Sequence, residues 1–253
     1  AWPSLVVPAE VHGLTLHGTD LRHRRSRLIT HAALPFIDLL GAASPDLAGK
    51  VPGYPKRAVD VLPCGVATDR FRPLDRPQAR AELGLQPDGR YLLFPADPAR
   101  VEKRFDRAQA IAARCGAKLL TLGSVDPQQV PLWVNAANAV VVPSDSEGFG
   151  LAVLEALACE VPVICAPTGV HDAATRGIVG ADCLPYNEQA WSELLEVSLG
   201  DANRRIVSRE RADQFSAQRM AERLLAAWRT HLASPLDSAA ARNEENVEPT
   251  PWD

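Results

Sequence analysis

The sequence predicts an α/β fold in which helices cover both faces of a parallel sheet. From residue 91 onward, short apolar segments alternate with amphipathic segments, a pattern typical of parallel sheets with helical connections. One amphipathic segment carries Phe105, Ala108 and Ile111 at helical spacing. The strand candidates are Tyr91–Phe94, Lys118–Leu122, Ala139–Val142, Val161–Cys165 and Asp182–Leu184. Ligands of such sheets bind beyond the carboxyl ends of the strands, so we expect a site there.

Composition limits the classes of function. The chain has 253 residues, enough for one large or two small domains, with 46% hydrophobic and 23% charged residues, as in an ordinary globular protein. Its net charge of −4 gives no case for nucleic acid as a partner. No apolar run reaches the roughly 18 residues that span a bilayer. Five cysteines without close pairing argue against a disulfide framework or zinc site, so we expect reduced thiols and a cytoplasmic protein.

The first part of the chain carries weaker signals. Strands are predicted at Leu14–His17 and Ala58–Leu62, an apolar run at Phe36–Leu40, and a helix start at Ser44. The basic segment Arg22–Arg27 favours a solvated helix face, with contact to an anionic acceptor or a membrane surface as the alternative.

The end of the chain is predicted to be helical and then irregular. Residues 66–90 form a connecting segment with a short helix near Ala79–Leu83, and residues 202–233 form a long helical region. Residues 234–253 lack periodicity and are expected to be disordered.

The segment after Ala139–Val142 is the strongest functional signal. Two glycines, Gly148 and Gly150, open a turn before a helix, and a helix N-terminus attracts phosphate. Glu147 precedes the turn and Glu155 lies about two helical turns beyond it. A carboxylate accepts hydrogen bonds from two neighbouring hydroxyls, so the segment suits a nucleotide-sugar. The alternative is a Gly-rich turn without a ligand, flanked by solvated glutamates.

The ordered motifs resemble those of retaining GT-B glycosyltransferases of family 4, the group 1 glycosyl transferases. Glu147 and Glu155 have the E-x7-E form of that family. The other matching pieces, in order, are Thr15–Asp20, Ala43–Leu47, Val61–Val66, Asp69–Phe71, Arg100–Lys103, Ala158–Ile164 and Gly169. The resemblance covers residues from about 13 to 230. It implies a GT-B fold with a complete C-terminal Rossmann-like domain and a partial N-terminal one.

The resemblance also implies a domain division. Residues 1–57 would be a remnant of the acceptor-side domain, 58–215 the nucleotide-sugar-binding domain, 216–233 a C-terminal helix, and 234–253 the disordered tail. Several strands of the N-terminal sheet are missing, so a second chain is expected to cover its open edge. We therefore expect the 253-residue chain to transfer sugar weakly or not at all by itself.

Residue roles follow from the same resemblance. The donor-binding residues would be Arg100, Lys103, Glu147, Gly148, Phe149, Gly150, Leu151 and Glu155. Glu155 would hold the ribose, Glu147 the donor sugar, and backbone amides of the glycine turn the diphosphate. Lys103 would neutralise the diphosphate leaving group, which lowers the barrier without a metal or other cofactor. Glu147, Lys103 and His17 would form the catalytic set, although His17 also fits a simple strand cap. His171 is expected on a loop near the donor pocket.

Three positions depart from the family pattern. Ala96 and Asp97 replace a Gly-Arg pair, so one expected cation is missing and Arg100 would substitute for it. Cys64 replaces an asparagine. These departures leave the donor glutamates in place.

The leading hypothesis is retaining transfer of a sugar from a nucleotide diphosphate to a small-molecule, glycan or lipid acceptor. By the resemblance, the donor phosphate itself assists the incoming hydroxyl. The alternative is a non-catalytic subunit that keeps the donor-binding fold for binding or assembly. A GT-B epimerase or phosphorylase is more remote, because the ordered motifs fit family 4.

Overall fold

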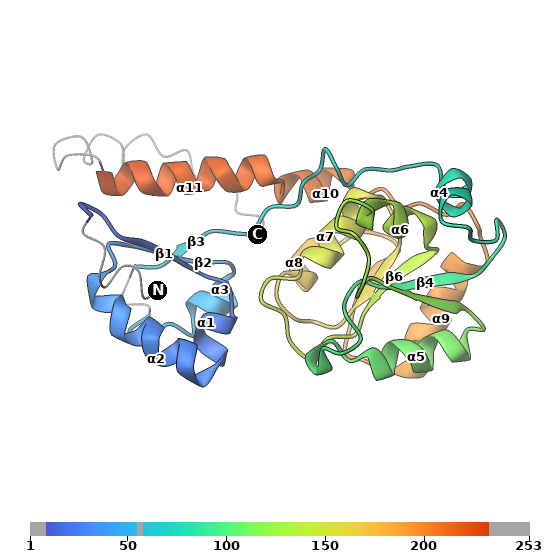
Figure 1. The fold of residues 1–253 in the computed structure, drawn as a ribbon, viewed down its shortest axis with the longest axis horizontal. Helices are drawn as coiled ribbons and strands as arrows, with labels where there is room; N and C mark the ends of the chain where they lie inside the picture. The colour runs from blue at the N-terminus through green and yellow to red at the C-terminus, as the bar shows by residue number, and fades with distance from the viewer. Residues whose placement is uncertain (1–8, 55–57, 233–253) are drawn as a thin grey trace. The chain divides into compact units, whose positions relative to one another are not determined.

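The computed structural model describes residues 9–54 and 58–232, which form two compact units. The first unit combines residues up to Gly65 with those from Ala217 onward, and the second is Val66–Ser216. Each unit has its own parallel sheet and helices (Figure 1), which confirms the predicted α/β class. The tail predicted to be disordered, 234–253, lies outside the described residues.

The first unit is built on a three-stranded parallel sheet in the order β1-β2-β3. Its strands are β1 (Gly13–Leu16), β2 (Leu39–Ala42) and β3 (Asp60–Val61). Its helices are α1 (Thr19–Arg22), α2 (Arg24–Ala33), the 3-10 helix η2 (Leu34–Phe36), α3 (Pro45–Ala48) and α11 (Ala217–Leu232). As the sequence predicted, Ser44 caps α3, its hydroxyl accepting from the Leu47 amide at 3.2 Å. Arg24, Arg25 and Arg27 are exposed on α2, as expected of a solvated helix face.

The division differs from the predicted one at both ends of the second unit. The strand β3 pairs with β2, so the first unit continues to Gly65 instead of ending at residue 57. The helix α11 also belongs to the first unit: Trp228 packs over Gly13, where no Cβ would fit. The Gly65 amide donates to the Met220 sulfur at 3.1 Å. These long-range contacts explain the difference, since they are invisible to local sequence patterns.

The second unit contains a five-stranded parallel sheet in the order β5-β4-β6-β7-β8. The strands are β4 (Tyr91–Phe94), β5 (Lys118–Thr121), β6 (Ala139–Val142), β7 (Val163–Cys165) and β8 (Ala181–Cys183). Each lies within a residue or two of its predicted position. The central strands β4 and β6 are buried along their whole length, because both of their faces are covered.

Helices cover both faces of this sheet (Figure 1). They are α4 (Arg76–Glu82), the 3-10 helix η3 (Val101–Lys103), α5 (Phe105–Arg114), α6 (Val130–Ala136), α7 (Leu151–Ala158), α8 (His171–Thr175), α9 (Glu188–Leu199) and α10 (Arg209–Gln214). On one face, Ile111 of α5 and Trp191 of α9 pack with Leu92 and Ile164 of the sheet. The helices α6 and α7 lie on the other face.

The predicted helical region 202–233 is interrupted. Residues 201–208 form no helix; within them, Ile206 is buried and its amide donates to the Glu160 carbonyl at 3.0 Å. The helices α10 and α11 are separate, and the chain passes from one unit to the other between them. Next to that crossing, the Val66 amide donates to the Phe215 carbonyl at 2.8 Å, so the first and last residues of the second unit lie together.

The order of strands defines where a ligand is expected to bind. From β4 the chain passes to β5 on one side and then returns to β6 on the other side of β4. The neighbours β4 and β6 therefore flank the topological switch point, and ligands of open α/β sheets bind at the carboxyl ends of such strands. In the part of the chain that the structure describes, no helix is long and apolar enough to cross a bilayer.

Candidate functional site

Lys103 and Glu147 meet at the switch point. Lys103 ends η3, which follows β4, and Glu147 lies in the loop that follows β6. The Lys103 Nζ lies 2.6 Å from the Glu147 Oε2, and the two side chains are 15% and 8% exposed. A short, mostly buried ion pair is charge-assisted, and removing one partner leaves the other charge without compensation. The segments that follow β4 and β6 thus each place one charged residue where a ligand is expected.

Backbone contacts and ion pairs hold the two loops together. The Asp145 amide donates to the Glu102 carbonyl at 3.0 Å, which joins the loop after β6 to η3. Arg104 has a left-handed φ of 57°, so the chain turns sharply between η3 and α5. These constraints place Lys103 beside the loop that carries Glu147.

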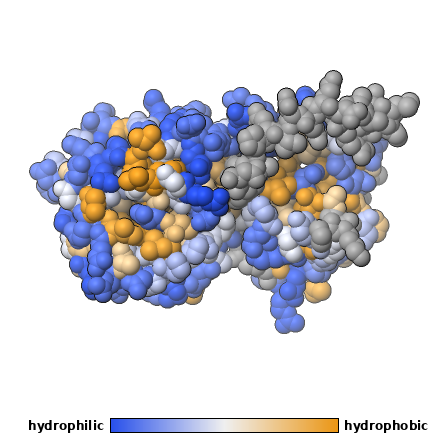
Figure 2. Space-filling model, turned by 180° about the vertical axis from the view of Figure 1, so that it is seen from behind, coloured by the Kyte–Doolittle hydropathy of each residue, from blue (hydrophilic) through white to orange (hydrophobic). Residues whose placement is uncertain are grey.

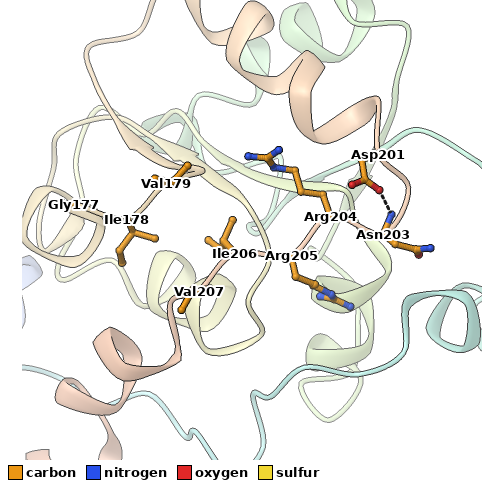
Figure 3. A pocket seen from close by; sticks show the side chains of 9 residues that line it. All are labelled: Gly177, Ile178, Val179, Asp201, Asn203, Arg204, Arg205, Ile206 and Val207. Atoms are coloured by element: carbon orange, nitrogen blue, oxygen red, sulfur yellow. Dashed lines mark hydrogen bonds between the residues drawn. The ribbon is translucent and has the colours of Figure 1, made fainter.

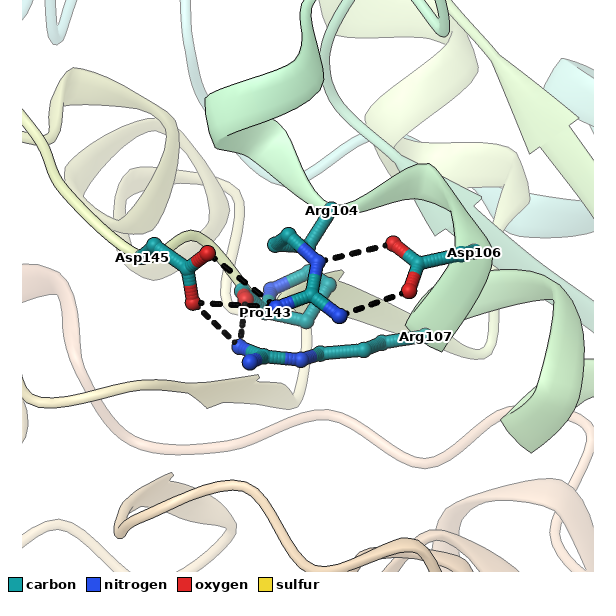
Figure 4. A network of polar contacts seen from close by, with 5 residues as sticks. All are labelled: Arg104, Asp106, Arg107, Pro143 and Asp145. Atoms are coloured by element: carbon teal, nitrogen blue, oxygen red, sulfur yellow. Dashed lines mark hydrogen bonds and ion pairs between the residues drawn. The ribbon is translucent and has the colours of Figure 1, made fainter.

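A network of two arginines and two aspartates supports this junction (Figure 4). Arg104 reaches Asp106 at 2.7 Å and Asp145 at 3.1 Å, and Arg107 reaches Asp145 at 2.8 Å. The Arg107 guanidinium also donates to the Pro143 carbonyl at 3.0 Å. Single exposed ion pairs contribute little to stability, but a shared network fixes side-chain positions. The network therefore links α5 to the loop after β6.

Two glycine turns interlock at the start of α7. Gly150 has a φ of 106° and Gly169, in the loop after β7, has a φ of 60°. The Val170 amide donates to the Phe149 carbonyl at 2.7 Å, and a Cβ at Gly169 would overlap that carbonyl. Only glycine fits both the backbone conformation and this close approach. The predicted glycine turn is thus held by a second turn, whose Gly169 was among the residues that match the family pattern.

The N-terminus of α7 offers free backbone donors. Within residues 9–54 and 58–232, the amides of Gly150, Leu151 and Ala152 donate no hydrogen bond. No side chain caps this helix end. Uncapped amides at a helix N-terminus carry partial positive charge and bind anions. The predicted donor residues Gly148, Phe149, Gly150 and Leu151 form this turn, and the Phe149 ring is buried against Phe215.

Glu155 lies on α7, largely removed from water. Burial raises the pKa of its carboxyl from 4.5 to about 7, and the nearby Arg70 guanidinium partly opposes that shift. Its carboxylate accepts no hydrogen bond from the described residues. A poorly solvated carboxylate without donors is well suited to accept ligand hydroxyls.

His171 lies at the site, although the sequence motifs gave it no role there. It begins α8 and is completely buried, with its Nδ1 2.7 Å from the Ala166 carbonyl. A Cβ at Gly150 would collide with its Nε2. Burial lowers the pKa of the imidazole, Glu147 raises it and Lys103 lowers it. The sequence indicated only a nearby loop; the position of His171 two residues after Gly169 is the signal that marks it.

The other predicted residues lie apart from the ion pair. Arg100 is exposed and pairs with Glu102 at 2.7 Å. The exposed Asp97 accepts from the Ala99 amide at 2.9 Å and stabilises its own loop. His17 belongs to the first unit, where its Nδ1 lies 3.4 Å from the Cys64 sulfur. Among the described residues, no cluster of three or more His, Cys, Asp or Glu side chains is placed to hold a metal, and all five cysteines are free.

A cavity of about 630 Å³ lies beside the segment that leads into the edge strand β8 (Figure 3). Its lining residues are Gly177, Ile178, Val179, Asp201, Asn203, Arg204, Arg205, Ile206 and Val207. Val179 and Val207 are 82% and 95% exposed. Figure 2 shows hydrophobic residues gathered in patches among hydrophilic ones on one face of the molecule. This cavity is separate from the ion pair and the α7 turn, which lie at the carboxyl ends of the strands.

Comparisons with solved structures define the class of fold. Sucrose-phosphate synthase from Thermosynechococcus elongatus superposes with a TM-score of 0.63 at 22% identity, covering 84% of this chain and 63% of that one. Anabaena HepE in complex with UDP superposes with a TM-score of 0.66 at 16% identity, covering 85% and 71%. The fold is that of GT-B glycosyltransferases, as the resemblance implied.

Sequence comparisons then define the family of the second unit. Residues 101–215 match the family described as glycosyl transferases group 1, so the chain contains a group 1 glycosyl transferase domain. This match includes Lys103, Glu147 and Glu155, and it confirms the family inferred from the motifs.

Curated relatives agree with this domain. The D-inositol 3-phosphate glycosyltransferase of Frankia alni is 35% identical over 48% of this chain and 40% of that relative. The proteins of the same name in Segniliparus rotundus and Mycobacterium leprae are 29% and 34% identical, over 88% and 68% of this chain and 59% and 49% of those relatives. The chain spans about half the length of the curated relatives it matches.

Proposed function

We propose that this protein transfers a sugar from a nucleotide diphosphate sugar to an acceptor hydroxyl, with retention of the anomeric configuration. The observation that carries the proposal is the buried Lys103–Glu147 pair at the switch point. Beside it lies an uncapped helix N-terminus on the same loop as Glu147. One cation, one carboxylate and free amides match the leaving group, the sugar hydroxyls and the phosphates of such a donor.

Each site residue has a distinct role in this proposal. Lys103 keeps two further N–H donors beyond its bond to Glu147 and stabilises the charge that develops on the diphosphate as the glycosidic bond breaks. Glu147 and Glu155 accept from the sugar and ribose hydroxyls, and the amides of the glycine turn face the diphosphate. Binding of hydroxyls favours the ionised form of Glu155, which burial disfavours in the free protein.

The chemistry requires no side-chain nucleophile and no metal. The departing phosphate accepts the proton of the incoming hydroxyl on the same face of the sugar, so the configuration is retained. His17, from the first unit, is proposed to act near the donor sugar. UDP is named in the complexes of the HepE neighbour, one of them with glucose, and the curated relatives are named for D-inositol 3-phosphate. A UDP-sugar and an inositol phosphate are therefore the first donor and acceptor to assay.

A panel of UDP-, GDP- and ADP-glucose tests the proposal directly. A matching donor stabilises the folded protein by mass action and raises its melting temperature. Glu155→Ala is expected to lose donor affinity and sugar transfer together. If no donor in the panel raises the melting temperature, the proposed site is wrong.

A non-catalytic subunit is the second candidate, because Asp97 places a negative charge where the family pattern has a cation. Such a subunit would bind its partner equally well with and without the Glu155 carboxylate. It would also give no sugar transfer with any acceptor, even where a donor binds.

A further inference from the structure

The side-chain charges at the proposed donor site cancel each other. Lys103 and Glu147 form one ion pair, so together they bring no net positive charge. Arg100, the other predicted cation, is exposed and pairs with Glu102. A donor diphosphate brings two negative charges. The partial positive charge of the α7 N-terminus accounts for only part of the compensation that this ligand needs.

His171 lies directly beneath the turn where that diphosphate is proposed to bind. Its ring edge occupies the space that a side chain at Gly150 would need. The Ala166 carbonyl can only accept, so the Nδ1 carries a proton and the neutral ring presents a bare Nε2. This Nε2 is buried and has no hydrogen-bond partner among the described residues.

Most of the ring's surroundings disfavour its charged form. Burial disfavours the imidazolium, and the positive end of α7 and Lys103 oppose a second positive charge there. The hydrogen bond to the Ala166 carbonyl and the charge of Glu147 act in the opposite direction and raise the pKa of His171. On its own helix, Asp172 is exposed and pairs with Arg176 at 2.9 Å. An anion placed on the α7 turn would reverse this balance.

We propose that His171 takes up a proton from solvent when a nucleotide diphosphate sugar binds, and so supplies the second positive charge beside the diphosphate. This inference rests on the proposed function. The proton enters at Nε2, while the Nδ1–H bond to Ala166 holds the ring in place. His171 thereby acts on the donor through the Gly150 turn, as a positioning residue whose charge depends on the ligand.

The expected signature is proton uptake on binding. If binding raises the pKa of His171 by about one unit, donor affinity gains up to about tenfold. The gain is complete below the pKa of the free protein and is lost as the pH rises through the pKa of the complex. Glu155 is expected to release a proton on donor binding, because binding favours its ionised form.

Calorimetry in buffers of different ionisation enthalpy measures this uptake, with UDP-, GDP- and ADP-glucose as probes between pH 5.5 and 8. The phosphates of these donors do not titrate in that range. The wild type is expected to take up more protons than His171→Asn, whose amide still donates to Ala166. The control is His231→Asn: His231 also lies 3.0 Å from a backbone carbonyl, that of Ala227, but is exposed. It should match the wild type.

Nitrogen-15 NMR of the wild-type imidazole gives a reading that depends on no variant. The His171 Nε2 should be unprotonated in the free protein at pH 7 and protonated in the donor complex. Donor binding with an unprotonated Nε2, or with equal proton uptake in wild type and His171→Asn, would overturn this inference alone. Absence of binding by every probe would contradict the proposed function and this inference with it.

Discussion

The second unit has a five-stranded sheet with a fully buried centre, whereas the first unit has three strands, the last of only two residues. The ion pair, the free helix amides, Glu155 and His171 all lie in the second unit. From the first unit only His17 was predicted to take part. The residues that we propose to recognise the donor therefore lie in one unit, and changes there and in the first unit should have different consequences.

Replacing Lys103 with methionine should have the largest effect. It removes the cation that pairs with the mostly buried Glu147 carboxylate and that we propose to face the leaving group, so we expect kcat to fall about 100-fold or more. Donor binding and steady-state transfer measure the loss. The matched control is Arg100→Met, in the same turn but exposed, which should retain nearly full binding. Equal losses in both variants would contradict the assignment of Lys103.

Replacing Gly150 with alanine should have the next largest effect. The φ of 106° is unfavourable for alanine, and its Cβ would collide with His171. We expect a loss of stability above about 2 kcal/mol, together with weaker donor binding. The control is Gly177→Ala, whose φ is 76° but whose Cβ would meet nothing within 4 Å. A smaller loss in urea unfolding for this control separates collision from backbone strain.

Glu155 should make the stability of the free protein depend on pH. Its folded pKa of about 7 lies above the ordinary value of 4.5, so the folded state binds more protons between these values. The contribution of Glu155 to the free energy of unfolding should therefore be largest below about pH 4.5 and fall as the pH rises to about 7. The expected loss is on the order of 3 kcal/mol. Urea unfolding should show this slope in the wild type and a flatter one in Glu155→Gln.

Replacing Trp228 with alanine should have the smallest effect on donor binding. Trp228 packs over Gly13 within the first unit, so its loss should destabilise that unit by about 1–3 kcal/mol. Donor affinity, measured by calorimetry, should stay within about twofold of the wild type. A large change in affinity would show that donor recognition is not confined to the second unit.

Local patterns were sufficient to predict the sheet of the second unit. Tyr91–Phe94 and Ala139–Val142 coincide with β4 and β6, because a fully buried parallel strand is a continuous apolar run. Glu147, Glu155 and Lys103 were predicted as site residues because they match the motifs of the family that the sequence resembles. The contact between Lys103 and Glu147 follows from the strand order, which no single segment encodes.

Features that depend on distant contacts were missed. The break before α10 arises because Ile206 pairs with Glu160, far away in sequence. The assignment of α11 to the first unit depends on Trp228 and Gly13, at opposite ends of the chain. The burial of His171 beneath Gly150 likewise joins two separate loops. In each case one long-range packing contact outweighs the local pattern.

The pairing of Val66 with the end of the second unit bears on how the chain folds during synthesis. Because both ends of that unit meet, it is an insertion within the first unit and needs no later residue to close its sheet. Domains fold as units while the ribosome elongates the chain. The second unit therefore emerges complete while the first still lacks α11, and the packing of Trp228 on Gly13 can form only after that helix has been made.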